Sequence, residues 1–380
     1  MKKTNYIAFF VVALAGLFYL VLTEKPALRH SQEPIPPDPY YSEEVSFKNV
    51  EDSITLLGTL TLPNKEGNFP VVILITGSGP QDRNIEVFGH KPFLVIADYF
   101  TRQGLAVLRY DDRGIGKSTG SFMTATSQDF ASDAISALNY LKTRSEINVQ
   151  KIGLLGHSEG GLVSAIAASQ CKEVRFVISL AGLGARGLEA LGLQTELIAR
   201  AGGVNDAGIA LIKKSNREVE EILNTTPDTT VLRKALTAYF KANGHQIPEE
   251  MVPPGQSKAK FFENSVNFMC TPWYQWLLKV DPADFYGKIA CPVLALNGSK
   301  DLQVDAKQNL PLIYKAVKNG GNPNVAIKEL PNLNHFFQNC NTGHPNEYAD
   351  IQETFSPLAL TTMTDWISMT IDQNINRLSQ

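Results

Sequence analysis

The sequence predicts an α/β fold in which a mostly parallel central sheet has flanking helices and carries an inserted helical cap. Three observations predict it. Short apolar runs of strand length alternate with stretches of helical periodicity over most of the chain. The segment Gly156-His157-Ser158-Glu159-Gly160 joins one such run to a helix of small residues that suits tight packing on a sheet. Between residues 184 and 280 the strand-like runs stop and helical periodicity takes over.

The N-terminal segment, residues 1–24, is predicted to be a signal peptide or a membrane anchor. Lys2 and Lys3 precede an uncharged run over residues 4–23, which is long enough to span a bilayer. Ala13-Leu14-Ala15 is similar to a cleavage site, but the apolar run continues beyond it, which favours an uncleaved anchor. The lysines before the run place the N-terminus in the cytoplasm and the rest of the chain outside. Residues 25–43 are proline-rich and predict an extended linker away from the membrane.

The strands of the core are predicted in two groups. Residues 44–48 and 54–62 form two antiparallel strands joined by a polar turn. Buried strands follow over residues 71–75, 106–110, 149–155, 174–180, 292–298 and 324–330. The core therefore comprises residues 44–183 and 281–375.

Residues 184–280 predict the cap, with helices over residues 189–201, 207–223 and 231–242. Inserted after the sixth strand, the cap would cover Ser158 and shape a substrate pocket. Trp273, Tyr274 and Trp276 either line that pocket or pack the cap onto the core.

Ser158 lies in a G-x-S-x-G pattern, which is typical of a sharp strand-to-helix turn that exposes a serine nucleophile. A side chain two residues to either side would collide where the helix doubles back over the strand. Asp301 follows a later strand, and His335 follows the last one. The order Ser, Asp, His, with each residue just past the end of a parallel strand, is that of one class of hydrolase.

Four segments carry a specific resemblance. They are the glycine-rich turn Thr76-Gly77-Ser78-Gly79-Pro80-Gln81-Asp82-Arg83-Asn84, the loop Asp111-Asp112-Arg113-Gly114-Ile115-Gly116-Lys117-Ser118, the turn at Ser158, and the Asp301/His335 pair. Over residues 45–366 the chain resembles an α/β-hydrolase of the serine aminopeptidase-like and short-chain carboxylesterase branch. Thr76 departs from the pattern, because many relatives have the histidine of an HG motif there.

The chemistry of acyl transfer assigns a role to each candidate residue. Ser158 is the nucleophile, His335 is the base and later the acid, and Asp301 fixes the tautomer of His335. The oxyanion donors are expected to be the backbone amides of Glu159 and Ser78, with Gly79 as the next choice.

Other residues compete for these roles. Asp305 is an alternative acid. A helix is expected to begin there, however, and the helix dipole alone would favour a carboxylate at that position. His30, His90, His157, His245 and His344 are interpreted as surface or packing residues. Asp82, Arg83, Asp112 and Arg113 are expected to hold their loops by local hydrogen bonds. Gly116-Lys117-Ser118 fails the full phosphate-loop pattern and is interpreted as a turn.

Composition excludes several classes of function. The formal net charge of the 380-residue chain is −3. The chain therefore has no excess of basic residues that would predict nucleic acid as a partner. No Cys/His cluster has the spacing of metal ligands, and no cofactor is expected. The four cysteines, Cys171, Cys270, Cys291 and Cys340, are too few for a disulfide scaffold, although one bridge is possible.

The sequence thus predicts an extracytoplasmic serine hydrolase that acts on a small-molecule acyl ester. An aminopeptidase or amidase is one alternative, and a non-catalytic binding protein on the same fold is another. An aminopeptidase needs carboxylates or carbonyls to bind the α-ammonium of its substrate, and no acidic cluster stands out near the triad loops or in the cap. Glu159 is the one exposed candidate that the sequence offers, but its place at the start of a helix gives an equally good electrostatic reason for a carboxylate there.

Overall fold

The central sheet organises the molecule. The computed structural model describes residues 30, 32–246, 252 and 255–378. Its sheet has 8 strands in the order β1-β2-β4-β3-β5-β6-β7-β8. Their bounds are β1 Tyr41–Asn49, β2 Ile54–Leu62, β3 Phe69–Ile75, β4 Ala106–Tyr110, β5 Ile147–His157, β6 Phe176–Leu180, β7 Val293–Gly298 and β8 Val325–Leu330.

The strand directions match the prediction. β1 and β2 form an antiparallel hairpin, and β2 pairs antiparallel with β4. All the remaining pairs, from β4 through β3 to β8, are parallel. Because parallel strands are covered on both faces, their residues form near-continuous buried runs, as in residues 71–75 of β3. Since these strands run parallel, the carboxyl ends of β3 to β7 meet at one edge of the sheet.

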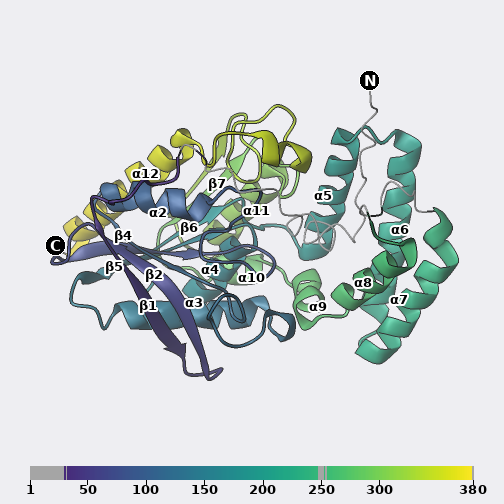
Figure 1. Ribbon diagram of the computed structural model, residues 1–380, viewed down its shortest axis with the longest axis horizontal. Helices are drawn as coiled ribbons and strands as arrows, with labels where there is room; N and C mark the ends of the chain where they lie inside the picture. Colours follow the sequence, from purple (N-terminus) through teal and green to yellow (C-terminus); the bar gives the residue numbers. More distant parts are fainter. Residues whose placement is uncertain (1–29, 31, 247–251, 253–254, 379–380) are drawn as a thin grey trace.

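Helices cover both faces of this sheet (Figure 1). Helices α2 (Pro92–Arg102) and α12 (Pro357–Leu378) pack on one face, in a cluster that includes Leu74 and Ile178. The helices whose side chains join the cluster on the other face are α3 Ser127–Leu141, α4 Glu159–Gln170, α10 Ala283–Tyr286 and α11 Ala306–Asn319. Short 3-10 helices span η1 Phe122–Thr124, η2 Gly244–Gln246 and η4 Pro345–Asp350.

The segment between β6 and β7 forms a helical lobe at the side of the core (Figure 1). Its apolar residues, including Leu236 and Phe240, belong to the same buried cluster as the α3–α4 face of the core. The lobe is thus packed continuously onto the core. Its helices are α5 Gly187–Ala201, α6 Asp206–Thr225, α7 Thr229–Asn243, α8 Lys258–Met269 and α9 Pro272–Lys279. All of them lie within the predicted cap, residues 184–280.

The described part of the predicted linker contacts the core. Gln32 accepts hydrogen bonds from the amides of Thr354 and Phe355, at 2.6 and 3.0 Å, and donates one to the carbonyl of Phe355. The ring of His30 stacks on His90 with 3.7 Å between centroids. The described part of the predicted linker over residues 25–43 therefore lies against the core, and β1 begins three residues before the predicted core boundary.

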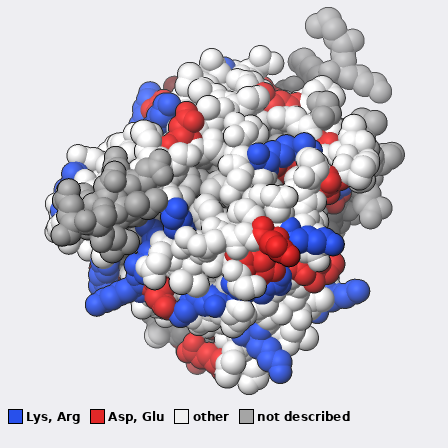
Figure 2. Space-filling view, turned by 90° about the vertical axis from the view of Figure 1, so that its left-hand side faces the viewer, with Lys and Arg blue, Asp and Glu red and all other residues white. Residues whose placement is uncertain are grey.

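The predicted signal peptide or anchor, residues 1–24, lies outside the described residues. Among the helices that the structure describes, none combines the length and the apolar character that crossing a bilayer requires. The four cysteines are all free thiols, so the bridge that the sequence left open is not formed. On the face drawn in Figure 2, acidic and basic side chains are interspersed among uncharged ones.

Candidate active site

Ser158 stands at a strained turn between β5 and α4. Its backbone has φ 56° and ψ −122°, a conformation that non-glycine residues rarely adopt. The flanking glycines permit the turn. A Cβ on Gly156 would lie 1.9 Å from the carbonyl oxygen of Gly160, and one on Gly160 would lie 2.3 Å from that of Ile75. The steric reason predicted for this pattern thus holds in the structure.

Asp301 and His335 form a buried pair. Nδ1 of His335 donates to Oδ2 of Asp301 over 2.8 Å, and the two side chains are 5% and 0% exposed. Oδ1 of Asp301 accepts the amides of Gln303 and Val304, at 2.8 and 2.9 Å. Because Nδ1 is a donor here, Nε2 of His335 is left to accept a proton.

Asp305, the alternative acid, caps a helix. Its side chain accepts the amide of Gln308 over 2.8 Å at the start of α11, whereas Asp301 bonds to His335. The interpretation of Asp305 as a helix N-terminal residue agrees with this contact.

Ser158 and His335 line one cavity of about 340 Å³ between the core and the cap. Among the described residues no hydrogen bond joins the Ser158 hydroxyl to His335. Such bonds are often long in unliganded hydrolases and tighten with substrate. The cavity wall is largely apolar, and its apolar side chains are Ile85, Val87, Phe88, Leu183, Ala190, Leu191, Leu277, Val304 and Phe336.

The aromatic residues of the cap do not line this cavity. Trp273 and Tyr274 are fully buried, and Trp276 packs on Phe285 with 6.4 Å between ring centroids. Of the two roles open to them, packing the cap onto the core is the one observed. The cap instead reaches the cavity with α5 and with Leu277 of α9.

The glycine-rich turn after β3 runs close to Ser158. Ser78 and Gly79 line the cavity, and a Cβ on Gly77 would lie 3.1 Å from the Cβ of Ser158. Gly79 has φ 95°, which a side chain would disfavour. The amide of Glu159, in the first turn of α4, has no partner within its own helix. The three predicted oxyanion donors therefore come from two segments that meet at Ser158.

Asp112 holds both ends of this turn. The hydroxyl of Thr76 donates to its Oδ1 over 2.6 Å, and the amide of Gln81 donates to its Oδ2 over 2.9 Å. Thr76, which replaces the usual histidine, thus has a carboxylate partner of its own. The sequence predicted a loop-holding role for Asp112, but these contacts span 31 to 36 residues and are not local.

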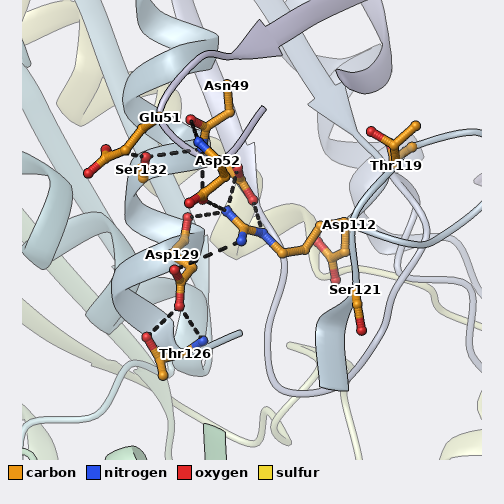
Figure 3. A network of polar contacts seen from close by, with 12 residues as sticks. Asn49, Glu51, Asp52, Asp112, Thr119, Ser121, Thr126, Asp129 and Ser132 are labelled. Atoms are coloured by element: carbon orange, nitrogen blue, oxygen red, sulfur yellow. Dashed lines mark hydrogen bonds and ion pairs between the residues drawn. The ribbon is translucent and has the colours of Figure 1, made fainter. Parts of the chain in front are cut away.

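The neighbours of Asp112 fix other parts of the core. Asp111 bonds to the guanidinium of Arg83 through both oxygens, at 3.0 and 2.8 Å. Arg113 donates to Asp133 and Asp52, each at 2.7 Å. Figure 3 shows Asp52 and the α3 residue Asp129 on the side of this network away from Asp112.

The network keeps its guanidinium charged. Burial alone would lower the pKa of Arg113, but its hydrogen bonds to Asp133 and the charge of that carboxylate hold the pKa above its usual value. Asp111, Asp112 and Arg113 thus connect the loop after β4 to different parts of the core, and the contacts of Asp112 hold the glycine-rich turn beside Ser158. Ser118 donates to the carbonyl of Asp111 over 2.9 Å, as part of the predicted turn.

The side chain of Glu159 is buried, and its prediction as an exposed candidate is wrong. It is 1% exposed and accepts hydrogen bonds from Ser127 of α3 and from the indole of Trp273, at 2.5 and 2.8 Å. Burial raises the pKa of this carboxyl. Glu159 therefore joins α4, α3 and the cap helix α9 and does not face the cavity.

Two other acidic residues line the cavity, although the sequence showed no acidic cluster near the triad loops. They are Asp82 and the exposed Glu86, both in the loop after the glycine-rich turn. Oδ1 of Asp82 accepts the amides of Asn84 and Glu86, at 3.1 and 2.9 Å. The carboxylate of Glu86 is free for a ligand at the rim.

His157 contacts the Asp301–His335 pair, which the sequence did not indicate. Its Nε2 lies 2.9 Å from the carbonyl oxygen of His335, which can only accept, so His157 donates. Burial and the neighbouring His335 lower the pKa of His157 to about 3. A histidine directly before Ser158 was the available signal, but the sequence does not reveal which carbonyl it contacts.

The remaining histidines are not near Ser158. His90 bonds to Thr354 and to the carbonyl of Tyr348, at 2.9 and 3.1 Å. His344 accepts the amide of Asn346, and His245 is exposed in the cap. Their interpretation as packing or surface residues agrees with these contacts.

Comparison with known proteins finds similarity to hydrolases. Residues 91–201 match a family model described as serine aminopeptidase, S33. Esterase EstD of Thermotoga maritima is 27% identical over 330 residues. That alignment covers 85% of this chain and 66% of the esterase, just under two thirds of the relative's length.

Solved structures share the fold. A structure of DcsB in complex with a substrate analogue has a TM-score of 0.54 at 18% identity, covering 87% of this chain and 99% of that chain. An esterase of Pyrococcus furiosus, PF2001, has a TM-score of 0.50 at 18% identity and covers 80% and 87%. These likenesses confirm the fold class predicted from the sequence.

Proposed function

We propose that this chain, a member of the α/β-hydrolase superfamily, is a serine hydrolase that cleaves carboxylic esters through an acyl-enzyme intermediate. One observation carries the proposal: a serine on a strained strand-to-helix turn lines the same apolar cavity as His335, whose ring is bonded to the buried Asp301. The similarity to an esterase supports the choice of substrate class.

The residues would act in the following order. Ser158 attacks the ester carbonyl while Nε2 of His335 takes the hydroxyl proton, and Asp301 stabilises the imidazolium that forms. The amides of Glu159 and Ser78, or of Gly79, hold the negative oxygen of the tetrahedral intermediate. His335 then gives its proton to the leaving alcohol, and water releases the acyl group by the same steps.

Replacement of Ser158 by alanine tests the proposal. We expect Ser158→Ala to lose turnover of p-nitrophenyl esters and labelling by a fluorophosphonate, with an unchanged circular dichroism spectrum. Full ester turnover by the variant would exclude a serine mechanism. A folded wild-type protein that neither hydrolyses esters or anilides nor takes the label would favour the non-catalytic binding protein instead.

An aminopeptidase is the second candidate, because Glu86 places a carboxylate at the rim of the cavity. A carboxylate there is suited to an α-ammonium group. Aminoacyl p-nitroanilides compared with p-nitrophenyl acyl esters separate the two activities. We expect higher kcat/KM on the esters. A higher value on the anilides, together with its loss in Glu86→Gln, would establish the aminopeptidase.

Export is proposed from the sequence alone. The uncharged run over residues 4–23 after two lysines supports an anchor or a signal peptide. Fractionation of cells that produce the full chain would distinguish them, since an anchor leaves the activity in the membrane pellet and a cleaved signal releases it.

A further inference from the structure

The cap contributes a polar group to an otherwise apolar wall of the cavity. Helix α5 lines the cavity with Gly187, Ala190, Leu191 and Gln194, which lie three, four and seven residues apart and thus on one face of the helix. Three of the four are small or apolar. Gln194 is the exception, and it is only 6% exposed.

Gln194 makes no hydrogen bond to any residue in the described part of the chain, yet neither polar atom of its side-chain amide is fully enclosed by other atoms. They must therefore reach open space, and the space that this residue lines is the cavity. Since the amide makes no hydrogen bond within the described part of the fold, folding gives no reason for glutamine rather than leucine at this position.

The two other glutamines of the cavity wall contrast with Gln194. Nε2 of Gln81 donates to the carbonyl of Ser78 over 2.8 Å, and Nε2 of Gln303 donates to the hydroxyl of Tyr348 over 3.0 Å. Each of these amides holds part of the core wall in place. Gln194 alone among the three has both ends of its amide available to a ligand.

We infer that Gln194 is a specificity residue that hydrogen-bonds an uncharged polar group of the substrate, away from the scissile ester. An amide or a hydroxyl fits, because a glutamine side chain offers both donors and acceptors. The preferred substrates are therefore esters functionalised with such a group, rather than plain alkyl esters that fit the apolar lining alone. This inference rests on the proposed ester hydrolysis and narrows its substrate class.

Pairs of esters matched in length test the inference. In one series the acyl chain carries the amide, as in p-nitrophenyl 3-acetamidopropanoate against p-nitrophenyl hexanoate. In the other the alcohol carries it, as in 4-acetamidophenyl acetate against 4-isobutylphenyl acetate. We expect kcat/KM of the wild type to be at least about tenfold higher for the amide member of one series, because sites with unpaired polar groups reject apolar analogues.

Variants assign the preference to the side chain. Gln194→Leu should remove the preference while keeping turnover of the alkyl member, and Gln194→Met is a second variant that keeps the length of the side chain. Thr195→Val is the matched control. Thr195 is the next residue of α5, is 1% exposed, donates to the carbonyl of Leu191 and does not line the cavity.

The outcomes separate this inference from the proposed function. Loss of the amide preference in the Gln194 variants, with the preference kept in Thr195→Val, supports it. Hydrolysis of both members at equal rates by the wild type, or an amide preference that survives in Gln194→Leu, overturns it and leaves ester hydrolysis intact. Equal loss on both esters in Gln194→Leu would indicate a structural role and would also overturn it. Absence of turnover on all esters would instead reject the proposed function.

Discussion

The turn at Ser158 in the core wall of the cavity and the cap helix α5 differ in the space around their main chain. At the turn, main chain approaches main chain: a Cβ on Gly160 would lie 2.3 and 2.4 Å from the carbonyl oxygens of Ile75 and Thr76. Helix α5 approaches main chain where it begins, since a Cβ on Gly187 would lie 2.0 Å from the carbonyl oxygen of Leu277, but a Cβ on Gly192, in the middle of the helix, would meet no atom within 4 Å. Close main-chain packing therefore fixes the turn at Ser158, while the middle of α5 leaves room for its residues to vary.

The largest expected effect lies in the core wall. Asp301→Asn should lower kcat/KM by about 10⁴-fold, the loss typical when a triad carboxylate that fixes the histidine tautomer is replaced. The neighbouring Asp305→Asn is the control, because asparagine caps a helix about as well as aspartate and should leave the rate nearly unchanged. Kinetics on one p-nitrophenyl ester measure both. The opposite pattern would transfer the orienting role to Asp305.

The second prediction concerns the backbone of the core wall. Gly160→Ala forces a methyl group against two carbonyl oxygens that belong to β3 and its exit turn, and neither can move without disturbing the sheet. We expect a loss of about 3 kcal/mol or more in the free energy of unfolding, the upper end for overpacked cores. Urea denaturation measures it. A variant as stable as the wild type would show that Gly160 does not pack closely against the carbonyl oxygens of Ile75 and Thr76.

The same contrast explains what the sequence could predict. The turn at Ser158, the strand ends at Asp301 and His335 and the cap bounds follow from local rules, because strand length, glycine spacing and helical periodicity are properties of neighbouring residues. Glu159 shows the limit. Its position suggested a side chain facing the substrate, but Ser127 and Trp273, far away in sequence, bury it.

Partners remote in sequence also decide the cavity lining. The sequence shows that Trp273 and Tyr274 are aromatic, but only the packing of α9 shows that they are buried while Leu277 lines the cavity. Likewise Thr76 departs from the family pattern, and its compensation by Asp112 needs two strands to be adjacent. Side-chain direction within a cap is set by tertiary packing, which periodicity does not encode.

Buried histidines give the third prediction, an acid-sensitive core. Burial lowers the pKa of His157 to about 3, against an ordinary value of 6.5. The unfolded chain therefore binds more protons between these values. The stability that this group contributes is full above pH 6.5 and is lost as pH falls toward 3.

For His157 alone, the loss between pH 6.5 and pH 5 should be on the order of 2 kcal/mol. Urea denaturation at the two pH values should show a smaller difference for His157→Gln than for the wild type. His245→Gln, at an exposed histidine of the cap, should leave the difference unchanged. Equal pH dependence in all three proteins would contradict the burial of His157 in its neutral form.

The smallest expected effect is a gain of stability in the cap helix α5. Gly192 lies inside helix α5, where glycine is less favourable than alanine by up to about 1 kcal/mol because it loses more backbone freedom on folding. Since the space around its Cα is open, Gly192→Ala should recover most of that amount as a higher urea midpoint. Gly192 does not line the cavity, so kcat/KM should stay the same. The pair Gly160→Ala and Gly192→Ala thus places the same added methyl group at the turn of the core and in the middle of the cap helix, and should move stability in opposite directions. A loss of stability in Gly192→Ala would show that the middle of α5 is as tightly packed as the turn at Ser158 and would remove the distinction between them.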